Sequence, residues 1–153
     1  MHHLLTGGSG GASRTADAGL LVLRVFAGLA LALAHGLGKL PPSPRFLATV
    51  QEMGFPAPHL FAWAAGVSEL FGGLLVAVGL LTRPAATLAL LTLLTAAVLR
   101  HAGDPFDERE KALLFAAVML LFALAGPGRY SLDALLARRR FPPGVSGAGT
   151  PRR

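Results

Sequence analysis

Several ionisable side chains lie within or at the edges of long apolar stretches of this sequence. A charge inside a membrane-spanning helix costs at least about 2.5–3.5 kcal/mol, so each of these residues is expected to have a partner or a function. Such groups could pair a cation with an acid, donate hydrogen bonds to a small polar ligand, or carry protons. The candidate ligand-binding set is Arg24, His35, Lys39, Glu69, His101 and Glu110.

The first apolar stretch places its polar residues on one helix face. Spacings of four, three, four and four residues bring the following side chains to the same side: Arg24, Gly28, Leu31, His35 and Lys39. A glycine on this face allows a neighbouring helix to approach closely. In the second stretch, Glu69 shares a face with two glycines, Gly66 and Gly73.

Helical rise predicts which of these residues meet. The backbones of Arg24 and Glu69 are expected to differ in depth by under about 10 Å, so an ion pair or a shared polar network between them is predicted. The remaining candidates fall toward the outer end of the helices. There we expect them to line a pocket with Glu69 at its floor: His35, Lys39, His101 and Glu110.

Other kinds of chemistry lack the required residues. The chain has no Cys, which excludes thiol chemistry, iron–sulfur clusters and cysteine-based zinc sites. A metal site built from His35, Glu69, His101 and Glu110 has no close ligand spacing to support it, and we predict none. Phosphate-binding loops, nucleophile elbows and HExxH are absent. Catalytic residues therefore stay unassigned, and no cofactor is expected on the chain itself.

The composition favours a membrane protein. Of the 153 residues, 53% are hydrophobic and 14% are charged, well below the roughly 25% typical of soluble domains. The net charge of +6 does not form a basic stripe interleaved with aromatic residues, so nucleic-acid binding is not expected.

Four apolar stretches predict an all-α integral membrane bundle of four transmembrane helices. About 20 residues are needed to cross a bilayer, and the expected helices cover 18–39, 60–81, 83–101 and 109–127. A soluble four-helix bundle is the alternative, but residues 84–99 and 112–126 lack a polar face. A cleaved signal peptide is the alternative for the first stretch, and Arg24 within it argues against that.

The charges outside these helices predict an orientation. Residues 1–17 and 137–153 are expected to be flexible tails, the second one basic. Eight Lys and Arg residues lie on the side of the termini and five on the other, which predicts cytoplasmic termini in a bacterial inner membrane. The cluster Arg138–Arg140 is expected to meet anionic lipids of the inner leaflet. In the first outward loop, apolar residues at positions 46, 47, 50 and 53 predict a short interfacial helix.

The chain resembles the DoxX family of small bacterial four-helix membrane proteins over roughly residues 18–135, within a membrane domain placed at 18–136. The matching motifs, as they stand in this sequence, are Leu23-Arg24 with Gly28, His35-Gly36, Lys39-Leu40, Phe46, Met53-Gly54-Phe55-Pro56, Glu69-Leu70-Phe71-Gly72-Gly73, Gly79-Leu80-Leu81-Thr82-Arg83, Glu110-Lys111-Ala112-Leu113-Leu114, Gly126-Pro127-Gly128 and Ser131-Leu132-Asp133.

The resemblance implies a membrane protein linked to redox or quinone chemistry, with no established catalytic residues to carry over. We expect an accessory subunit that binds a quinone-like or other small amphipathic ligand, with a soluble or membrane redox partner and association with further copies of the chain as open expectations. The alternatives are a quinone-reducing oxidoreductase subunit and a small transporter or proton pathway that uses the buried Arg, Glu and His groups.

Overall fold

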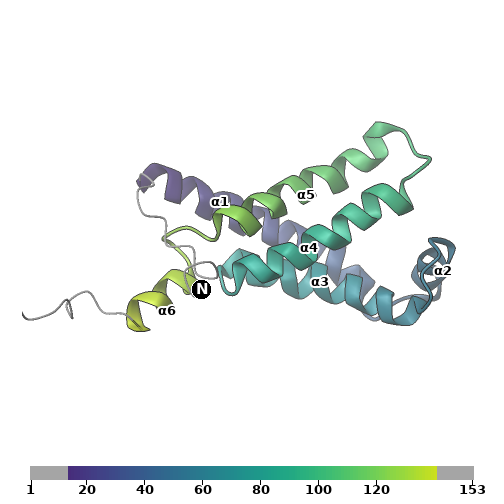
Figure 1. Cartoon of the computed structure of the whole chain (residues 1–153), viewed down its shortest axis with the longest axis horizontal. Helices are drawn as coiled ribbons and strands as arrows, with labels where there is room; N and C mark the ends of the chain where they lie inside the picture. The colour runs from purple at the N-terminus through teal and green to yellow at the C-terminus, as the bar shows by residue number, and fades with distance from the viewer. Residues whose placement is uncertain (1–13, 141–153) are drawn as a thin grey trace, which may run out of the picture.

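A computed structural model describes residues 14–140, and all regular structure within that range is helical. Four long helices run side by side along the long axis of the molecule, and two short helices lie at its opposite ends (Figure 1). The helices are α1 (Arg14–Ala30), α2 (Pro44–Glu52), α3 (Pro58–Val78), α4 (Thr82–Thr95), α5 (Phe106–Ala125) and α6 (Leu132–Arg140).

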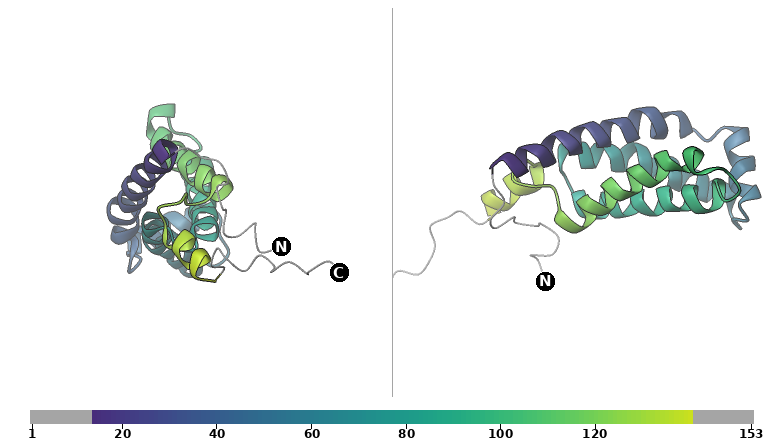
Figure 2. Two further views of the ribbon diagram at one scale, coloured as in Figure 1. Left: turned by 90° about the vertical axis from the view of Figure 1, so that its left-hand side faces the viewer. Right: turned by 90° about the horizontal axis from the view of Figure 1, so that it is seen from above.

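Two of the long helices continue beyond their α-helical part. The first runs on through a π-helical segment, Leu31–Gly36, and a 3-10 turn, Leu37–Lys39. α4 continues through a second π-helical segment, Ala96–Arg100. Both extensions lie at the end of the bundle that carries α2, which we call the α2 end; the opposite end is the α6 end (Figure 2). π-Helical segments often occur at functional sites.

Local sequence explains where the helices begin and end. Ser43 caps α2, accepting a hydrogen bond from Phe46 N at 3.2 Å, and Pro44 occupies the first turn. At the other end of the bundle α3 stops at Gly79, whose φ of 73° is a left-handed conformation that glycine adopts without strain. The tight turn that follows lets α4 return antiparallel to α3.

Small residues bring α1 and α3 into direct contact. A Cβ atom on Gly28 would meet Gly73 O at 2.6 Å and Ala77 N at 2.7 Å, so no larger residue fits at this crossing. The close approach expected of Gly28 is thus confirmed. α3 also packs on α4, and α4 packs on α5, whereas α1 and α5 touch little.

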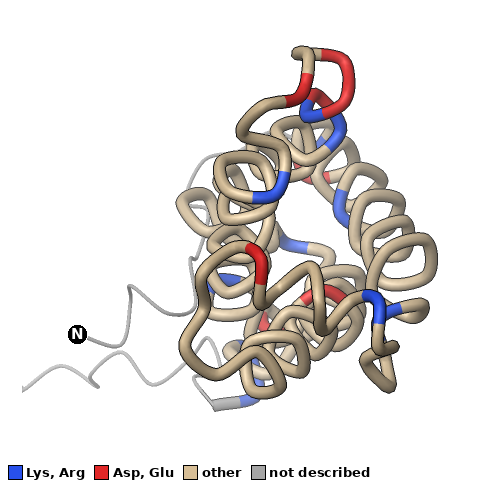
Figure 3. Tube along the Cα trace, turned by 90° about the vertical axis from the view of Figure 1, so that its right-hand side faces the viewer, with Lys and Arg blue, Asp and Glu red and all other residues tan. Residues whose placement is uncertain are grey.

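The outer surface of the bundle is apolar. Val22, Phe26 and Leu124 are 69%, 72% and 70% exposed. Viewed along its axis, the chain carries few charged positions (Figure 3). Three helical stretches are long and apolar enough to cross a membrane: Arg14–Lys39, Pro58–Val78 and Thr82–Arg100. α5 is 20 residues long but carries a run of five charged residues near its start, Asp107–Lys111.

The structure has helical stretches at Arg14–Lys39, Pro58–Val78, Thr82–Arg100 and Phe106–Ala125, against the expected 18–39, 60–81, 83–101 and 109–127; that all four cross a membrane stays a prediction. The ends of the two predicted tails differ from the structure. Residues 14–17, assigned to a flexible tail, form the first turn of α1, and Asp17 is buried. Residues 137–140, assigned to the basic tail, belong to α6. The rest of both predicted tails lies outside the described residues. A short helix, α2, occurs where one was expected; its position at a membrane interface stays a prediction.

Candidate functional site

Arg24 belongs to a polar network at the α6 end of the bundle. It is 2% exposed and donates to three backbone oxygens. Its Nε bonds Ala77 O at 3.2 Å, Nη1 bonds Pro127 O at 2.9 Å and Nη2 bonds Tyr130 O at 2.7 Å. Ala77 lies in the last turn of α3, where the unpaired carbonyls and the helix dipole favour a cation. Arg24 thus ties α1 to the end of α3 and to the loop after α5.

The predicted pair between Arg24 and Glu69 is wrong. Arg24 contacts α3 at Ala77, which lies eight residues from Glu69, or about 12 Å along the helix. Its long side chain turns toward the end of α3, where Ala77 lies. Carbonyl oxygens there satisfy the guanidinium without a carboxylate.

Two buried acids complete the α6-end network, and neither was among the candidate site residues predicted from the sequence. Asp133 accepts hydrogen bonds from Leu81 N, Thr82 N and Thr82 Oγ1 at 2.9, 3.0 and 3.0 Å, which caps the start of α4. Asp17 accepts from Arg129 N at 3.1 Å. Asp133 belongs to the matching motif Ser131-Leu132-Asp133, which could have indicated it; Asp17 was assigned to a tail.

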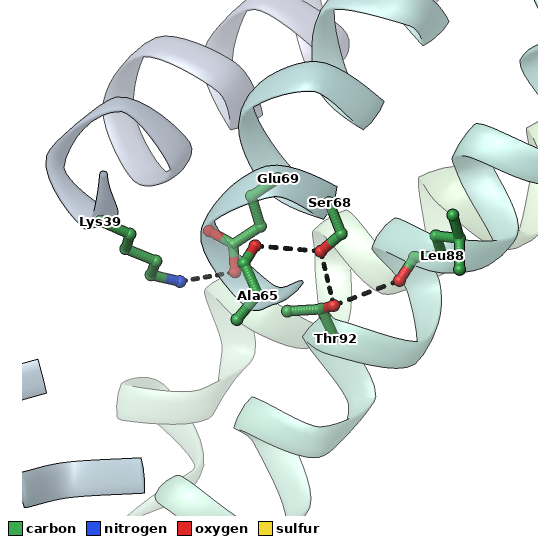
Figure 4. A network of polar contacts seen from close by, with 6 residues as sticks. All are labelled: Lys39, Ala65, Ser68, Glu69, Leu88 and Thr92. Atoms are coloured by element: carbon green, nitrogen blue, oxygen red, sulfur yellow. Dashed lines mark hydrogen bonds and ion pairs between the residues drawn. The ribbon is translucent and has the colours of Figure 1, made fainter. Parts of the chain in front are cut away.

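A different polar cluster lies toward the α2 end (Figure 4). Lys39 Nζ is 2.5 Å from Glu69 Oε1, and the side chains are 28% and 2% exposed. Lys39 also lies 5.6 Å from the centre of the Phe46 ring, a cation–π arrangement. The acid predicted for the pocket floor therefore pairs with a cation from its own end of the bundle.

Glu69 is only partly satisfied. Its second oxygen, Oε2, is buried and has no hydrogen-bond partner among residues 14–140. A buried acceptor without a partner costs about 1–3 kcal/mol, and more when it is charged. Such groups are uncommon in folded proteins, and each one calls for an explanation; Asp17 Oδ2 at the α6 end is another.

Two hydroxyl groups next to Glu69 were also missed from the sequence. Ser68 Oγ lies 2.7 Å from Thr92 Oγ1, joining α3 to α4. Ser68 also lies 3.0 Å from Ala65 O, and Thr92 lies 3.2 Å from Leu88 O. Each hydroxyl has one hydrogen, and these contacts use both. These hydroxyl oxygens can still accept hydrogen bonds. The same holds for Thr95, whose hydroxyl donates to Leu91 O at 2.8 Å.

These residues line a cavity of about 730 Å³ between α2, α3 and α4. We call the part lined by Glu69, Ser68 and Thr92 its floor. The lining from the α2 region is largely apolar and consists mainly of Phe46, Val50, Met53 and Phe55. The cations Arg45 and Arg100 also line the cavity. Ligand sites of small molecules have this combination of apolar walls and a few placed polar groups.

The structure brings only part of the predicted set to this cavity. Lys39, Glu69 and His101 line it; Arg24, His35 and Glu110 do not. His101 Nδ1 lies 2.7 Å from Asp104 Oδ2, which orients the ring. His35 packs edge-on against Phe115, with ring centres 5.3 Å apart.

Glu110 is exposed on α5. Within residues 14–140, no three His, Asp or Glu side chains are grouped so that they could hold a metal ion.

Comparisons with known proteins agree with the family expected from the sequence motifs. The DoxX family model matches residues 19–102, more than half of the chain. The chain is 35% identical over 124 residues to the inner membrane protein YphA of Escherichia coli, covering 73% of this chain and 89% of YphA. It is 33% identical over 133 residues to the inner membrane protein YqjF of the same organism, covering 80% of this chain and 95% of YqjF.

A third relative has a name that mentions an activity. The chain is 32% identical over 124 residues to the Bacillus subtilis protein named "Putative oxidoreductase CatD", covering 79% of this chain and 89% of that protein. No solved structure matches the chain. The family match and these relatives show that the chain is a helical membrane protein of the DoxX family.

Proposed function

We propose that this protein binds a quinone-like or other small amphipathic molecule in the α2-end cavity, as an accessory subunit linked to membrane redox processes. The observation that carries the proposal is the cavity itself, in which the pair Lys39–Glu69 lies beneath largely apolar walls. An aromatic ring fits against Phe46 and Met53, and the oxygen of a polar head group can accept a hydrogen bond from the remaining Lys39 donors.

A redox role is supported by the name of the relative from Bacillus subtilis, which describes an oxidoreductase. In this role the chain supplies the ligand site. A partner protein supplies the redox centre and delivers electrons to the bound molecule. Whether the chain acts as a binder or as part of a quinone-reducing enzyme is then decided by that partner.

In our proposal the protein crosses the bacterial inner membrane four times, with both termini in the cytoplasm. The names of the two Escherichia coli relatives support this membrane. α5 is the fourth span, with its charged first turns at the α2 end, outside the hydrocarbon region. The α6 end then faces the cytoplasm, and α2 lies at the outer surface. Reporter fusions after Arg140 should be cytoplasmic, and fusions within 41–58 or 102–108 should be external.

A proton pathway is the second candidate function, and the geometry supports it less. Such a path needs polar groups between Glu69 and the network of Arg24. The stretch of α3 that separates these two levels reads LFGGLLV, residues 70–76, without a titratable side chain. Glu69 is therefore better suited to a ligand site than to a relay across the bundle.

Cavity filling tests the proposal. Wild-type protein purified in mild detergent should retain quinone from the membrane, detectable by mass spectrometry of the extracted lipids, and should bind added decylubiquinone. Ala65→Phe adds a ring to the cavity wall and should abolish both. Ala117→Phe makes the same change at an exposed position of α5 and should leave both intact. Equal binding by wild type and Ala65→Phe would contradict the proposal.

A further inference from the structure

The polar groups of the α2-end cavity are not arranged evenly. Its floor carries oxygen atoms: the Glu69 carboxylate, whose Oε2 is enclosed in this conformation, and the hydroxyls of Ser68 and Thr92. The two hydroxyl hydrogens have three acceptors within the protein: one hydrogen joins the two hydroxyls, and the other goes to Ala65 O or Leu88 O. As the ion-pair partner of Lys39, the Glu69 carboxylate accepts hydrogen bonds and donates none. The unused hydrogen-bonding capacity of the floor is therefore acceptor capacity, which only a ligand that donates a hydrogen bond can fill.

Other side chains that line the cavity have the opposite character. Arg45 and Arg100 line it as well, and arginine side chains only donate. Lys39 is the donor in contact with Glu69 Oε1, and an ammonium group has three N–H groups, so this contact leaves others for a ligand. A ligand oxygen can thus accept from Lys39, but only a ligand that also donates a hydrogen bond can satisfy Glu69.

From this arrangement we infer that the site selects hydrogen-bond donors, and binds the reduced, dihydroxy form of a quinone in preference to the oxidised form. This inference rests on the proposed function. A hydroquinone hydroxyl accepts from Lys39 and donates to the Glu69 carboxylate. A quinone carbonyl only accepts, so it leaves Oε2 as unsatisfied as it is without ligand.

Glu69 can reach such a hydroxyl with a small movement. Oε2 is enclosed in this conformation, but the terminal torsion of a glutamate is broad, so rotation of the carboxylate turns the oxygen toward the cavity. Lys39 can follow, because its side chain is 28% exposed and flexible. A hydrogen bond to a buried carboxylate is stronger than one between neutral groups, so a preference of about tenfold or more is expected.

The experiment compares ligands that differ in the donor. Protein in nanodiscs is incubated without oxygen with decylubiquinol or decylubiquinone, and retained ligand is quantified against empty nanodiscs. Wild type should retain the quinol about tenfold better or more. Glu69→Gln supplies an amide N–H to the floor, so the ratio should fall toward one. Glu108→Gln, at an exposed position of α5 outside the cavity, should keep the wild-type ratio.

A second pair of probes needs no variant and no redox control. A 4-alkylphenol and its methyl ether have nearly the same shape, but only the phenol donates. Wild type should retain the phenol better by a similar factor. If quinone and quinol, or phenol and ether, are retained equally, donor selection is wrong and the proposed function stands. If none of the four probes is retained above empty nanodiscs, the proposed function fails as well.

Discussion

Arg24 and Asp133 at the α6 end are satisfied to a much greater degree than Glu69 at the α2 end. Arg24 donates to three carbonyl oxygens, on α3 and in the turn after α5, and Asp133 accepts three hydrogen bonds at the start of α4. Asp17, also at the α6 end, has an oxygen without a hydrogen bond among the described residues, but this oxygen lies 3.8 Å from Arg129 Nε. At the α2 end, Glu69 has one partner, Lys39, and an oxygen without any among the described residues.

This difference separates structural charge from charge available for binding. A side chain whose hydrogen bonds are all made holds elements together, and no ligand can use it without breaking them. A buried group with an unmade hydrogen bond lowers the stability of the folded protein, and a ligand that makes this bond raises the stability again. Arg24 and Glu69 are both almost fully buried, so burial alone does not distinguish the two roles; the partners do.

Loss of Arg24 should have the largest effect. Arg24→Ala leaves the carbonyls of Ala77, Pro127 and Tyr130 without their donor, and should destabilise the protein by about 3–5 kcal/mol. Thermal unfolding in detergent measures this loss. Arg139→Ala removes an exposed arginine of α6 at the same end, and should change stability little. If the two variants melt alike, Arg24 does not have the structural role assigned here.

The contact between α1 and α3, which joins the two ends, should be the next most sensitive feature. Gly28→Ala forces a Cβ atom toward the backbone of Gly73 and should cost about 1–3 kcal/mol in thermal unfolding. On the same helix, a Cβ on Gly19 meets nothing within 4 Å, so Gly19→Ala should be neutral or slightly stabilising. If Gly28→Ala were also neutral or slightly stabilising, helix propensity and not close packing would govern this position.

The overall fold was largely predictable because hydropathy acts over whole helices. The stretch expected at 60–81 is observed as Pro58–Val78, and the one expected at 83–101 as Thr82–Arg100. The start of α1 was misplaced because its first turn, Arg14–Asp17, is polar. Polar residues are common in the first turn of a helix, but a prediction that follows an apolar run begins the helix only after them.

The partners of the charged residues were harder to predict. The spacing of residues predicts on which face of a helix a side chain lies and how far along the helix it lies. This spacing was enough to predict that Lys39, Glu69 and His101 lie toward the same end of the bundle. The acceptors of Arg24, however, are backbone carbonyls in the turn Pro127–Tyr130, and any residue type could supply them. The contact of Ser68 with Thr92 depends on how α3 is rotated against α4, which neither helix determines alone.

The smallest expected effect is a coupling energy between two substitutions. It distinguishes the observed pair, Lys39–Glu69, from the predicted pair, Arg24–Glu69. In a double-mutant cycle, Lys39→Ala and Glu69→Ala should show a coupling of about 1 kcal/mol, because they remove the two halves of one ion pair that is partly open to solvent. Arg24→Ala and Glu69→Ala, at opposite ends, should be additive to within about 0.5 kcal/mol. Thermal unfolding of the single and double variants measures both cycles. A coupling between Arg24 and Glu69 as large as that between Lys39 and Glu69 would mean that the two ends share one polar network. Glu69 would then have a structural role like that of Arg24, and its Oε2 atom would no longer indicate a ligand site.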